Sequence, residues 1–464
     1  MNLDIEIVKK LIKKCEPGHR DFIIMAEQSE RYYNRENDIK FKDRERKNEC
    51  QDRPLRNADN RIASNFHRLL IDQKSSYMFT AQPLFDVSDD YANTVIYNTL
   101  GNKFGKVCIK LCNMASNSGV AWIYYWSDTE GFKYTIVDSK QVIPVWDTTV
   151  EDKLKAVLRV YKELEDDGKT YEVYEYYTDD MIYSYRAEHG DIDTLKEYEC
   201  YNCYNVDMRQ SAFVSSVPNP FGRIPFIPFF NNSEHTRDLD LNKDQIDTYD
   251  KVYSGFLNDL EDIQEVIFVL SGYEGESLEK FLSELKMFKT IKVDAAEEDG
   301  QAKGDLQTLT IDIPVEARKI MLEMTRKSIF EQGMGIDPDP QNFGNSSGIA
   351  LGYLYSLLEL KAGATEAEFK MGFSELINAI CNYYGLAVNK IIQTWTRTKV
   401  RTDSELCEIA KNSVGLISKR TIAENHPWVK NIERELQRIE EEELEEVNKD
   451  EADMFTRVKT DETE

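Results

Sequence analysis

Between residues 246 and 270 the chain carries apolar residues three or four positions apart, without a break. These residues are Ile246, Tyr249, Tyr253, Phe256, Leu260, Ile263, Ile267 and Leu270. Their spacing keeps them on one face of an α-helix, and such an unbroken stripe is typical of a helix that packs lengthwise on its neighbours. Asn242, with Gln245 three residues later, resembles a capping box that starts the helix. A helix over 242–271 would be roughly 45 Å long, the length of a strut or spacer.

A second long helix is predicted after a short excursion of the chain. Residues 272–313 have mixed character, with strand-like runs at 290–293 and 306–313. Pro314 then stands where the first turn of a helix tolerates proline, and the helix runs to Gly333, which can serve as the residue just past its end. The two helices would therefore flank a small subdomain of mixed structure and project it to the end of a stalk.

The sequence between residues 120 and 230 predicts an antiparallel β domain. Its short β-branched or aromatic runs are 121–126, 134–137, 142–146, 156–161, 171–177, 181–185 and 224–230. Turn sequences such as Asp167-Gly168 divide these runs. The many tyrosines resemble a surface for stacking bases, but few basic residues lie among them. We therefore interpret them as residues that pack on both faces of a sheet.

Helices are expected before the β domain. Residues 1–50 are charged and helix-prone, which indicates a solvated arm. Residues 57–78 repeat apolar residues at helical spacing, with Gln73 as the polar exception.

Helices also follow the second long helix. A very apolar helix begins near residue 349 and contains Gly363 and Gly372, one of which is a predicted kink because glycine weakens a helix interior. Beyond it, residues 404–412 and 418–425 form a smaller helical module that leads into an acidic end.

The composition excludes several classes of function. The 464 residues carry a net charge of −26, so a DNA-gripping protein of the usual basic-patch type is disfavoured. The eight cysteines show no framework spacing and there is no secretory signal, which favours a reducing cytosol. Cys200 and Cys203 form a lone C-x-x-C without the second pair of ligands that structural zinc needs, so no metal is expected. No apolar run reaches the length of a membrane span.

One motif suggests an enzyme. Residues 344–348 fit the G-x-S-x-G pattern of a serine nucleophile, here Ser346. That chemistry needs a buried strand before the serine, but the prolines at 338 and 340 oppose a strand, and the only downstream histidine is His426. We interpret Ser346 or Ser347 as the cap of the following helix. A hydrolase and a helical scaffold or adaptor that does not bind DNA stay as alternatives.

The order of these parts resembles the portal proteins of tailed bacteriophages, in the family typical of phages with long, non-contractile tails. The segments that carry the resemblance are 61–65 with 77–79, 131–132 with 144–147, 224–232, 347–351 and 415–421. Each segment is weak alone, and their order and spacing together make the resemblance. It covers the chain from about residue 57 to 443.

The resemblance implies an α+β subunit of a twelve-membered ring at one capsid vertex, through which double-stranded DNA is packaged and ejected. Its parts would be a β-containing wing (1–240), a stem helix (241–271), an α/β clip (272–313), a second stem helix (314–333), a tunnel loop (334–348), a long kinked wing helix (349–396) and a helical crown with an acidic tail (397–464). The protein would be no enzyme and would need no cofactor. The chain has no G-x-x-x-x-G-K-[ST] loop, so ATP hydrolysis would come from a separate motor.

The resemblance also implies contact sites and partners. The DNA-facing residues of the tunnel loop would be Asp337, Asp339, Gln341, Asn342, Phe343 and Asn345. The stripe at 246–270 would form the subunit interface of the stem. The clip residues that dock the motor or the connector would be Lys286, Lys289, Lys292, Glu297, Glu298 and Asp299. The partners would be further copies of the chain, double-stranded DNA, the terminase large subunit, a head–tail connector, and the major capsid and scaffolding proteins. The protein would be assembled in the bacterial cytoplasm, would reside in the virion and would contact no membrane.

Overall fold

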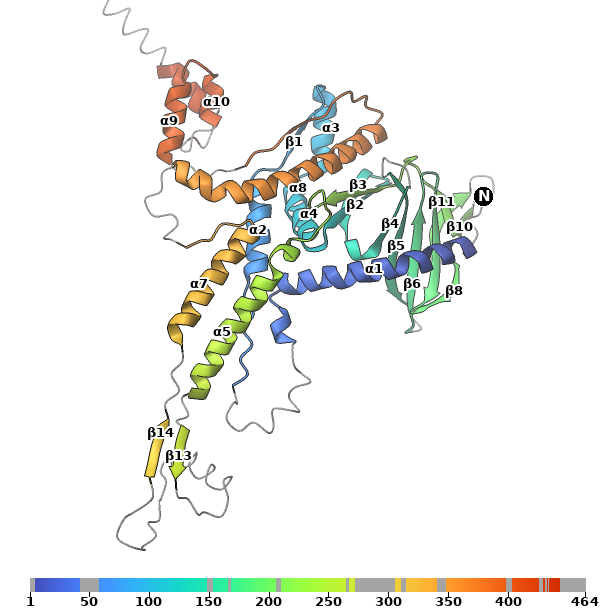
Figure 1. Cartoon of the computed structure of the whole chain (residues 1–464). Helices are drawn as coiled ribbons and strands as arrows, with labels where there is room; N and C mark the ends of the chain where they lie inside the picture. Colours follow the sequence, from blue (N-terminus) through green and yellow to red (C-terminus); the bar gives the residue numbers. More distant parts are fainter. Residues whose placement is uncertain are drawn as a thin grey trace, which may run out of the picture. The chain divides into compact units, whose positions relative to one another are not determined.

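The computed structural model describes residues 5–41, 58–147, 153–165, 168–205, 210–263, 267–271, 305–309, 314–339, 348–397, 403–424 and 434–442, with the single residues 429 and 432 (Figure 1). The chain divides into two compact units. One comprises residues 1–338 and 355–396, and the other comprises residues 339–354 and 397–464. Both helices and sheets are present, as expected for an α+β protein. None of the helices in the described ranges is long and apolar enough to cross a membrane.

The first unit contains two antiparallel sheets that face each other. The larger sheet has the order β4 (Val142–Trp146), β5 (Leu154–Leu164), β6 (Thr170–Tyr177) and β7 (Met181–Glu188), with β11 (Ser216–Pro218) and β8 (Asp191–Glu197) along the far edge of β7. The smaller sheet has the order β12 (Phe226–Phe230), β2 (Val120–Asp128) and β3 (Gly131–Val137), and a separate ribbon pairs β9 (Tyr201–Asn205) with β10 (Gln210–Val214). The predicted antiparallel β domain is confirmed. The strands β8 to β11 were not predicted, because they lack a clear apolar alternation.

Alternate residues of the larger sheet enter two different cores. Leu158, Tyr174 and Tyr185 lie in one core with Val8 and Ile12 of helix α1 (Ile5–Tyr33). On the same strands, the residues that point to the other face of the sheet lie in the core against the smaller sheet. They are Val157, Tyr177 and Ile182, together with Trp122 and Phe226. The tyrosines therefore pack on both faces of the sheet, as predicted.

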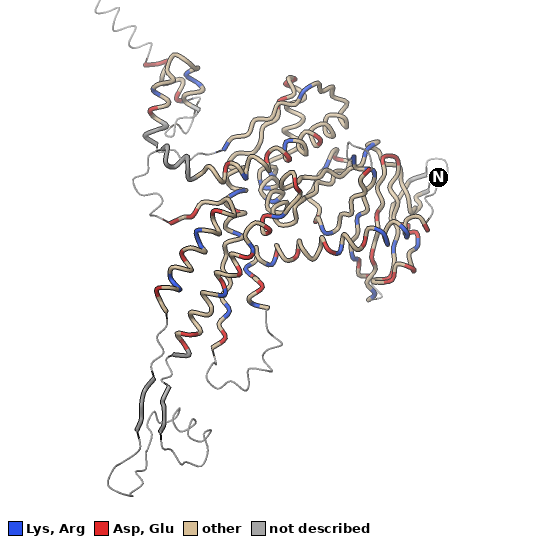
Figure 2. Tube along the Cα trace, viewed as in Figure 1, with Lys and Arg blue, Asp and Glu red and all other residues tan. Residues whose placement is uncertain are grey.

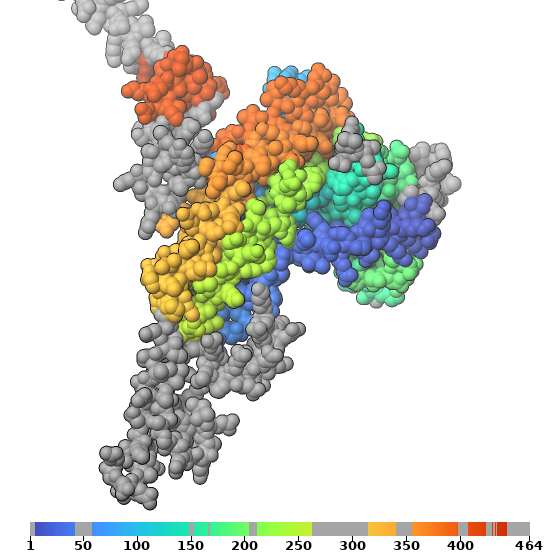
Figure 3. Space-filling view, viewed as in Figure 1, coloured from blue at the N-terminus to red at the C-terminus, as the bar shows by residue number. Residues whose placement is uncertain are grey.

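The expectation of a solvated N-terminal arm is wrong. Val8 is 0% exposed and Ile12 is 3% exposed, because α1 lies along the larger sheet and covers one of its faces (Figure 3). The apolar residues of α1 recur too weakly among lysines and glutamates for this packing to be read from the sequence. Burial of that apolar stripe fixes α1 in place.

A third core joins the smaller sheet to four helices. These are α2 (Phe66–Met78), α3 (Asp90–Leu100), α4 (Phe104–Ser118) and α8 (Gly348–Tyr383). The predicted long helix is present as α8, which runs without interruption through both of its glycines, but it ends at Tyr383 and not near residue 396. Gly385, with a left-handed φ of 69°, follows its end, and Ile392–Thr394 form a strand. Gly372 has a packing role, since a Cβ there would lie 2.7 Å from a ring carbon of Phe229. Gly119 ends α4 in the left-handed conformation, with φ of 82°, beside the carbonyl of His235.

The helix predicted over 57–78 begins only at Phe66. The residues before it run beside helix α5 (Lys243–Ile263) without regular secondary structure, and side chains of α5 bind their backbone. The N–H groups of Asn60, Ile62 and Ser64 donate to Asn258 Oδ1 at 2.6 Å, to Ser254 Oγ at 3.0 Å and to Asp250 Oδ1 at 2.8 Å, respectively. These bonds satisfy backbone groups that a helix would otherwise pair internally.

Helices α5 and α7 (Val315–Gln332) pack side by side, as predicted for the two long helices (Figures 1 and 3). The first of them is shorter than predicted. It ends at Ile263, and residues Ile267–Ser271 form strand β13, which pairs antiparallel with β14 (Asp305–Leu309). The run Ile267-Phe268-Val269 is β-branched or aromatic, so strand pairing overrides its helical spacing.

Two expectations about helix ends are wrong. Asn242 does not form the predicted capping box: its Oδ1 is buried and accepts no hydrogen bond from the described residues. Gly333 ends α7 with a right-handed φ of −72°, and the left-handed residue is Met334. A side chain at residue 333 is disfavoured for another reason, since a Cβ there would lie 2.7 Å from the carbonyl oxygen of Ile329 and 2.6 Å from Leu70 Cδ1.

The remaining regular elements are short. Strands β1 (Leu84–Asp86) and β15 (Ile392–Thr394) pair antiparallel within the first unit. The described part of the second unit contains α9 (Asp403–Ser413) and α10 (Lys419–Glu424), which match the predicted helical module.

Candidate functional site

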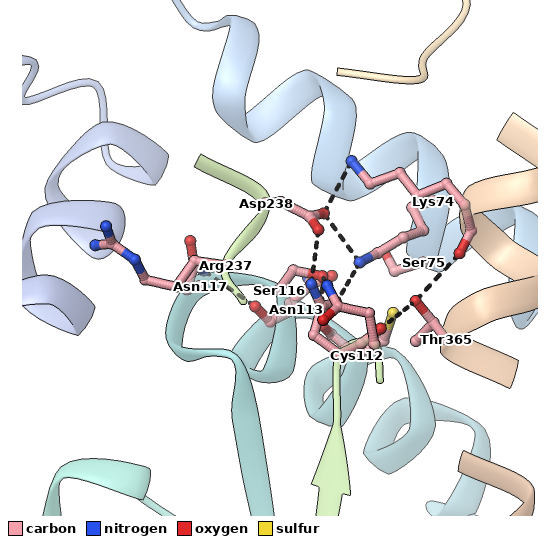
Figure 4. Close-up of polar contacts among 12 residues, drawn as sticks. Lys74, Ser75, Cys112, Asn113, Ser116, Asn117, Arg237, Asp238 and Thr365 are labelled. Atoms are coloured by element: carbon pink, nitrogen blue, oxygen red, sulfur yellow. Dashed lines mark hydrogen bonds and ion pairs between the residues drawn. The ribbon is translucent and has the colours of Figure 1, made fainter. Parts of the chain in front are cut away.

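A buried charge cluster lies where α2, α8 and the segment after β12 converge (Figure 4). Its centre is Asp238, which is 4% exposed. Lys74 Nζ lies 2.9 Å and Lys361 Nζ lies 3.0 Å from the carboxylate oxygen Oδ2. Asn231 donates from Nδ2 to the other carboxylate oxygen at 2.8 Å. Two lysines therefore share one carboxylate inside the protein.

The cluster is held in its charged form by mutual attraction. Burial alone would raise the pKa of Asp238, but the charges of Lys361 and Lys74 and the hydrogen bond from Asn231 hold that pKa well below its usual range. Burial lowers the pKa of Lys361, and Asp238 opposes that effect. Nearby, burial lowers the pKa of His67 to about 4, so its ring is neutral at pH 7. The hydrogen-bonded carboxylate offsets part of the cost of burying the ammonium groups.

The cluster ties the end of α7 to α8. Lys361 Nζ donates to the carbonyl of Gly333 at 2.9 Å, directly after the last residue of α7. Thr365, one turn further along α8, donates to the carbonyl of Asn231 at 2.8 Å. Lys74 on α2 donates to Asn231 Oδ1 at 2.6 Å. A displacement of α7 relative to α8 would therefore break hydrogen bonds made by buried charges, which is costly.

The first residues of the proposed tunnel loop are anchored to the same region. Gln73 on α2 forms two hydrogen bonds with the backbone of Ile336: its Nε2 donates to the carbonyl at 2.7 Å, and its Oε1 accepts from the N–H at 3.0 Å. Asp337 pairs with Arg326 of α7 through two contacts, of 2.6 Å and 3.2 Å. Asp337 was predicted to face DNA, but its charge is offset within the subunit. Gln73, the polar exception of the predicted helix, is thus explained by its bonds to the loop.

Gln73→Leu should weaken the anchoring of this loop. The substitution keeps the size of the side chain but leaves the N–H and the carbonyl of Ile336 without their partner, at a cost of about 1–3 kcal/mol. Amide hydrogen exchange should show a loss of protection at Ile336. Gln73→Glu is the matched control, because its carboxylate still accepts from the N–H. If both variants exchange at the wild-type rate, Gln73 does not hold the loop.

The predicted stripe on α5 divides into inner and outer residues. Ile246 was predicted at the subunit interface, but it is 0% exposed and lies in a core of its own subunit with Tyr32, Leu70, Leu239, Ile329 and Phe330, so it cannot meet a neighbour. Tyr249 packs edge-on against the ring of Phe66, with ring centroids 5.0 Å apart, and the guanidinium of Arg318 lies 5.4 Å from the centre of the Phe256 ring. Tyr253 and Leu260 are each 43% exposed. The side chains of Ile263, Ile267 and Leu270 lie outside the described residues.

Helix α7 also presents apolar side chains to solvent within the subunit. Val315, Ile320, Met321 and Met324 are between 43% and 64% exposed. Figure 2 shows acidic and basic residues interspersed along both α5 and α7. One such pair joins the two helices, between Arg318 and Asp259. The exposed surface of the α5–α7 pair is thus a mixture of apolar side chains and paired charges.

Several predicted site residues cannot be placed. Gln341, Asn342, Phe343 and Asn345 of the loop, the serine Ser346, and the clip residues Lys286, Lys289, Lys292, Glu297, Glu298 and Asp299 all lie outside the described residues. Asp339 is described and is partly buried. Cys200 and Cys203 carry free thiols, and the described residues contain no group of three or more side chains suited to a metal ion.

The buried cluster was missed in the sequence, although a signal for it exists. Phe66, Leu70 and Lys74 follow one another at intervals of four, so Lys74 continues the apolar face of α2. A lysine on such a face needs a buried acidic partner or a route to solvent. The sequence does not indicate which of the many carboxylates is that partner.

The charges of the Asp238 cluster thus bind one another and backbone groups, and they hold helices of the subunit together. The chain matches the family model described as "Phage portal protein, SPP1 Gp6-like" over residues 12–449, and it belongs to that family. The family role is that of a channel at the capsid vertex for DNA packaging and ejection. The resemblance seen in the sequence is confirmed.

Two curated relatives bear the name portal protein. The chain is similar to the portal protein of Clostridium phage phiCD119, with 38% identity over 447 residues, which cover 93% of this chain and 94% of that protein. It is also similar to the portal protein of Bacillus phage SPP1, with 29% identity over 426 residues, which cover 89% of this chain and 82% of that protein. Among solved structures, a chain in the neck of an empty gene transfer agent particle aligns with 10% identity and a TM-score of 0.44, over 77% of this chain and 89% of that one.

Proposed function

We propose that twelve copies of this chain form a closed ring around a channel for double-stranded DNA, with the α5–α7 pair at the subunit interfaces. The observation that carries this proposal is the apolar surface that the pair leaves exposed. Leu260 on α5 is 43% exposed, and Met324 on α7 is 64% exposed. Exposed apolar side chains of this kind are typical of a surface that another protein covers. Because a ring joins two different faces of each subunit, α5 of one copy would pack against α7 of the next.

The loop after α7 would face the channel. Its proposed DNA-facing residues are Asp337, Asp339, Gln341, Asn342, Phe343 and Asn345, and the ion pair with Arg326 offsets the charge of Asp337. Residues 334–348 contain no lysine or arginine, so the loop offers phosphates no cation to bind. It would act as a collar that does not adhere to the passing duplex.

The chain would act with several partners and would lack catalytic activity. The clip residues Lys286, Lys289, Lys292, Glu297, Glu298 and Asp299 are proposed to contact the terminase large subunit, which would supply the ATP hydrolysis, and later the head–tail connector. Capsid and scaffolding proteins would surround the ring, and assembly would take place in the host cytoplasm. The hydrolase alternative has only the pattern at Ser346 in its favour.

The mass of the assembled particle tests this function. Native mass spectrometry of the purified protein should give a particle near twelve times 53.9 kDa, and electron micrographs should show rings with a central channel. A monomer with esterase turnover that disappears in Ser346→Ala would replace this proposal by the hydrolase alternative. Open chains of variable length would exclude a closed ring.

A further inference from the structure

One part of this acidic chain contains no acidic residue. Acidic residues make up 84 of the 464 residues, yet residues 91–127 contain neither aspartate nor glutamate. This segment covers α3 after its first residue and the whole of α4. At the average density of the chain, a segment of this length would carry about seven carboxylates. The surface contributed by residues 91–127 is therefore neutral or positive, unlike the chain as a whole, although Asp89 and Asp90 lie at the start of α3.

Three lysines form a row on α4. Lys103, Lys106 and Lys110 are spaced by three and four residues, which places them on one helical face, and all three are exposed. None of them forms an ion pair with a residue in the described ranges. Some exposed lysines elsewhere on the chain are paired. Lys13, for example, lies 2.8 Å from a carboxylate oxygen of Asp193.

The end of α4 adds to the positive potential of the row. Lys103 is the N-cap residue, its side chain makes no capping hydrogen bond, and the first turn contains no acidic residue. The positive end of the helix dipole therefore lies beside Lys103 without a compensating carboxylate. Along the helix the row is about 10 Å long. Three successive phosphates of one DNA strand span about 7 Å along the duplex axis, at roughly 3.4 Å of rise each, so a row of this length can reach three of them.

Exposed polar side chains also occur on α3 and in the turn between α3 and α4. Tyr91 and Tyr97 of α3 are 71% and 61% exposed, and Asn98 and Asn102 are exposed as well. Tyrosine, asparagine and lysine are among the residues that contact DNA phosphates without reading the sequence. Within the described residues, helix α4 packs chiefly on α1, α2 and β2. Its exposed face thus lies outside the surface assigned above to the subunit interfaces.

We propose that the exposed face of α3 and α4, with Lys103, Lys106 and Lys110 at its centre, binds the phosphate backbone of duplex DNA outside the channel. The inference rests on the proposed ring, because it assigns the face a contact with DNA that has already passed through the ring. An acidic protein segment is the competing occupant. The exposed amide donors of Asn98 and Asn102, which precede Lys103 closely along the chain, favour DNA, since phosphate oxygens accept from such groups all along the strand.

Closed circular duplex DNA separates this face from the channel, because a covalently closed circle cannot thread an assembled ring. Wild-type rings should bind relaxed duplex circles at 50 mM salt. Three phosphate contacts predict a loss of affinity of about 40-fold between 50 and 200 mM salt. Lys103→Gln/Lys106→Gln/Lys110→Gln should bind circles at least tenfold more weakly at 50 mM salt, and its log–log salt slope should be smaller by about 2.7.

Lys13→Gln/Lys133→Gln/Lys169→Gln is the matched control, because it removes the same charge from exposed lysines that have ion-pair partners. It should bind circles as the wild type does. Equal binding by both triple variants would overturn the proposal. The proposal would also be overturned if the rings bound poly-glutamate more tightly than duplex DNA of equal charge and if that binding needed the same three lysines. If the wild type forms no rings, the proposed function is refuted instead. If the rings are intact but do not bind circular DNA, this inference alone is refuted.

Discussion

Leu260→Asp and Met324→Asp are each expected to abolish ring assembly while the subunit stays folded. Both side chains are substantially exposed in the single subunit, so an aspartate there has access to water before assembly. In the ring, each interface would bury an unpaired carboxylate, which costs several kcal/mol, and a closed ring repeats that cost at every interface. Sizing chromatography with light scattering should show monomers, and circular dichroism should show the wild-type spectrum.

Leu164→Asp serves as the control for these variants. Leu164 lies at the end of β5 and is 72% exposed, but it is not part of the α5–α7 pair. Its replacement should leave rings intact. Intact rings in Leu260→Asp and in Met324→Asp would mean that the α5–α7 pair does not form the interface.

Asp238→Asn is expected to destabilise the subunit by about 3–5 kcal/mol, because it leaves two buried lysines without their shared carboxylate. The triple variant Lys74→Met/Asp238→Asn/Lys361→Met should recover much of this loss, since it removes the uncompensated charges and keeps apolar volume. A variant with three substitutions would thus be more stable than one with a single substitution. Urea denaturation monitored by circular dichroism measures both effects.

Asp193→Asn is the control for this series, because the ion pair of Asp193 with Lys13 is exposed to water and its loss should not change the denaturation midpoint measurably. If Asp238→Asn denatures at the same urea concentration as Asp193→Asn, the buried cluster does not hold the subunit together. If the triple variant is less stable than Asp238→Asn, the hydrogen bonds to Asn231 and Gly333 outweigh the charges.

The sequence correctly predicted those elements whose residue pattern is compatible with only one kind of secondary structure. The strands β2 to β7 and the apolar face of α8 follow from period and residue type, and the structure contains them. The end of α5 was wrong because Ile267 and Leu270 fit a helical stripe, while the β-branched run around them fits a strand equally well. Only the pairing with residues 305–309, far along the chain, decides between the two.

The buried site could be predicted less well than the fold. Lys74 is visible in the sequence as a charge on an apolar face, but its partner Asp238 lies 164 positions away among many other carboxylates. The ion pair of Asp337 could not be predicted for a similar reason: acidity is visible in the sequence, whereas the guanidinium of Arg326 that offsets it depends on the fold. Pairings between residues so far apart in the sequence can be identified only from the three-dimensional structure.

The segment beside α5 has a consequence for how the family can vary. The backbone N–H groups of residues 60, 62 and 64 donate to side chains at 258, 254 and 250. Each step of two residues in the segment before α2 therefore matches a step of four residues in α5. Two residues of extended chain span about 6.6 Å, and four residues of helix span about 6 Å, so the two repeats are nearly commensurate. A one-residue insertion in this segment or in α5 would turn every later N–H donor away from its side-chain acceptor. Insertions and deletions between residues 60 and 64, or between 250 and 258, should therefore be absent from functional relatives, even where the residues themselves change.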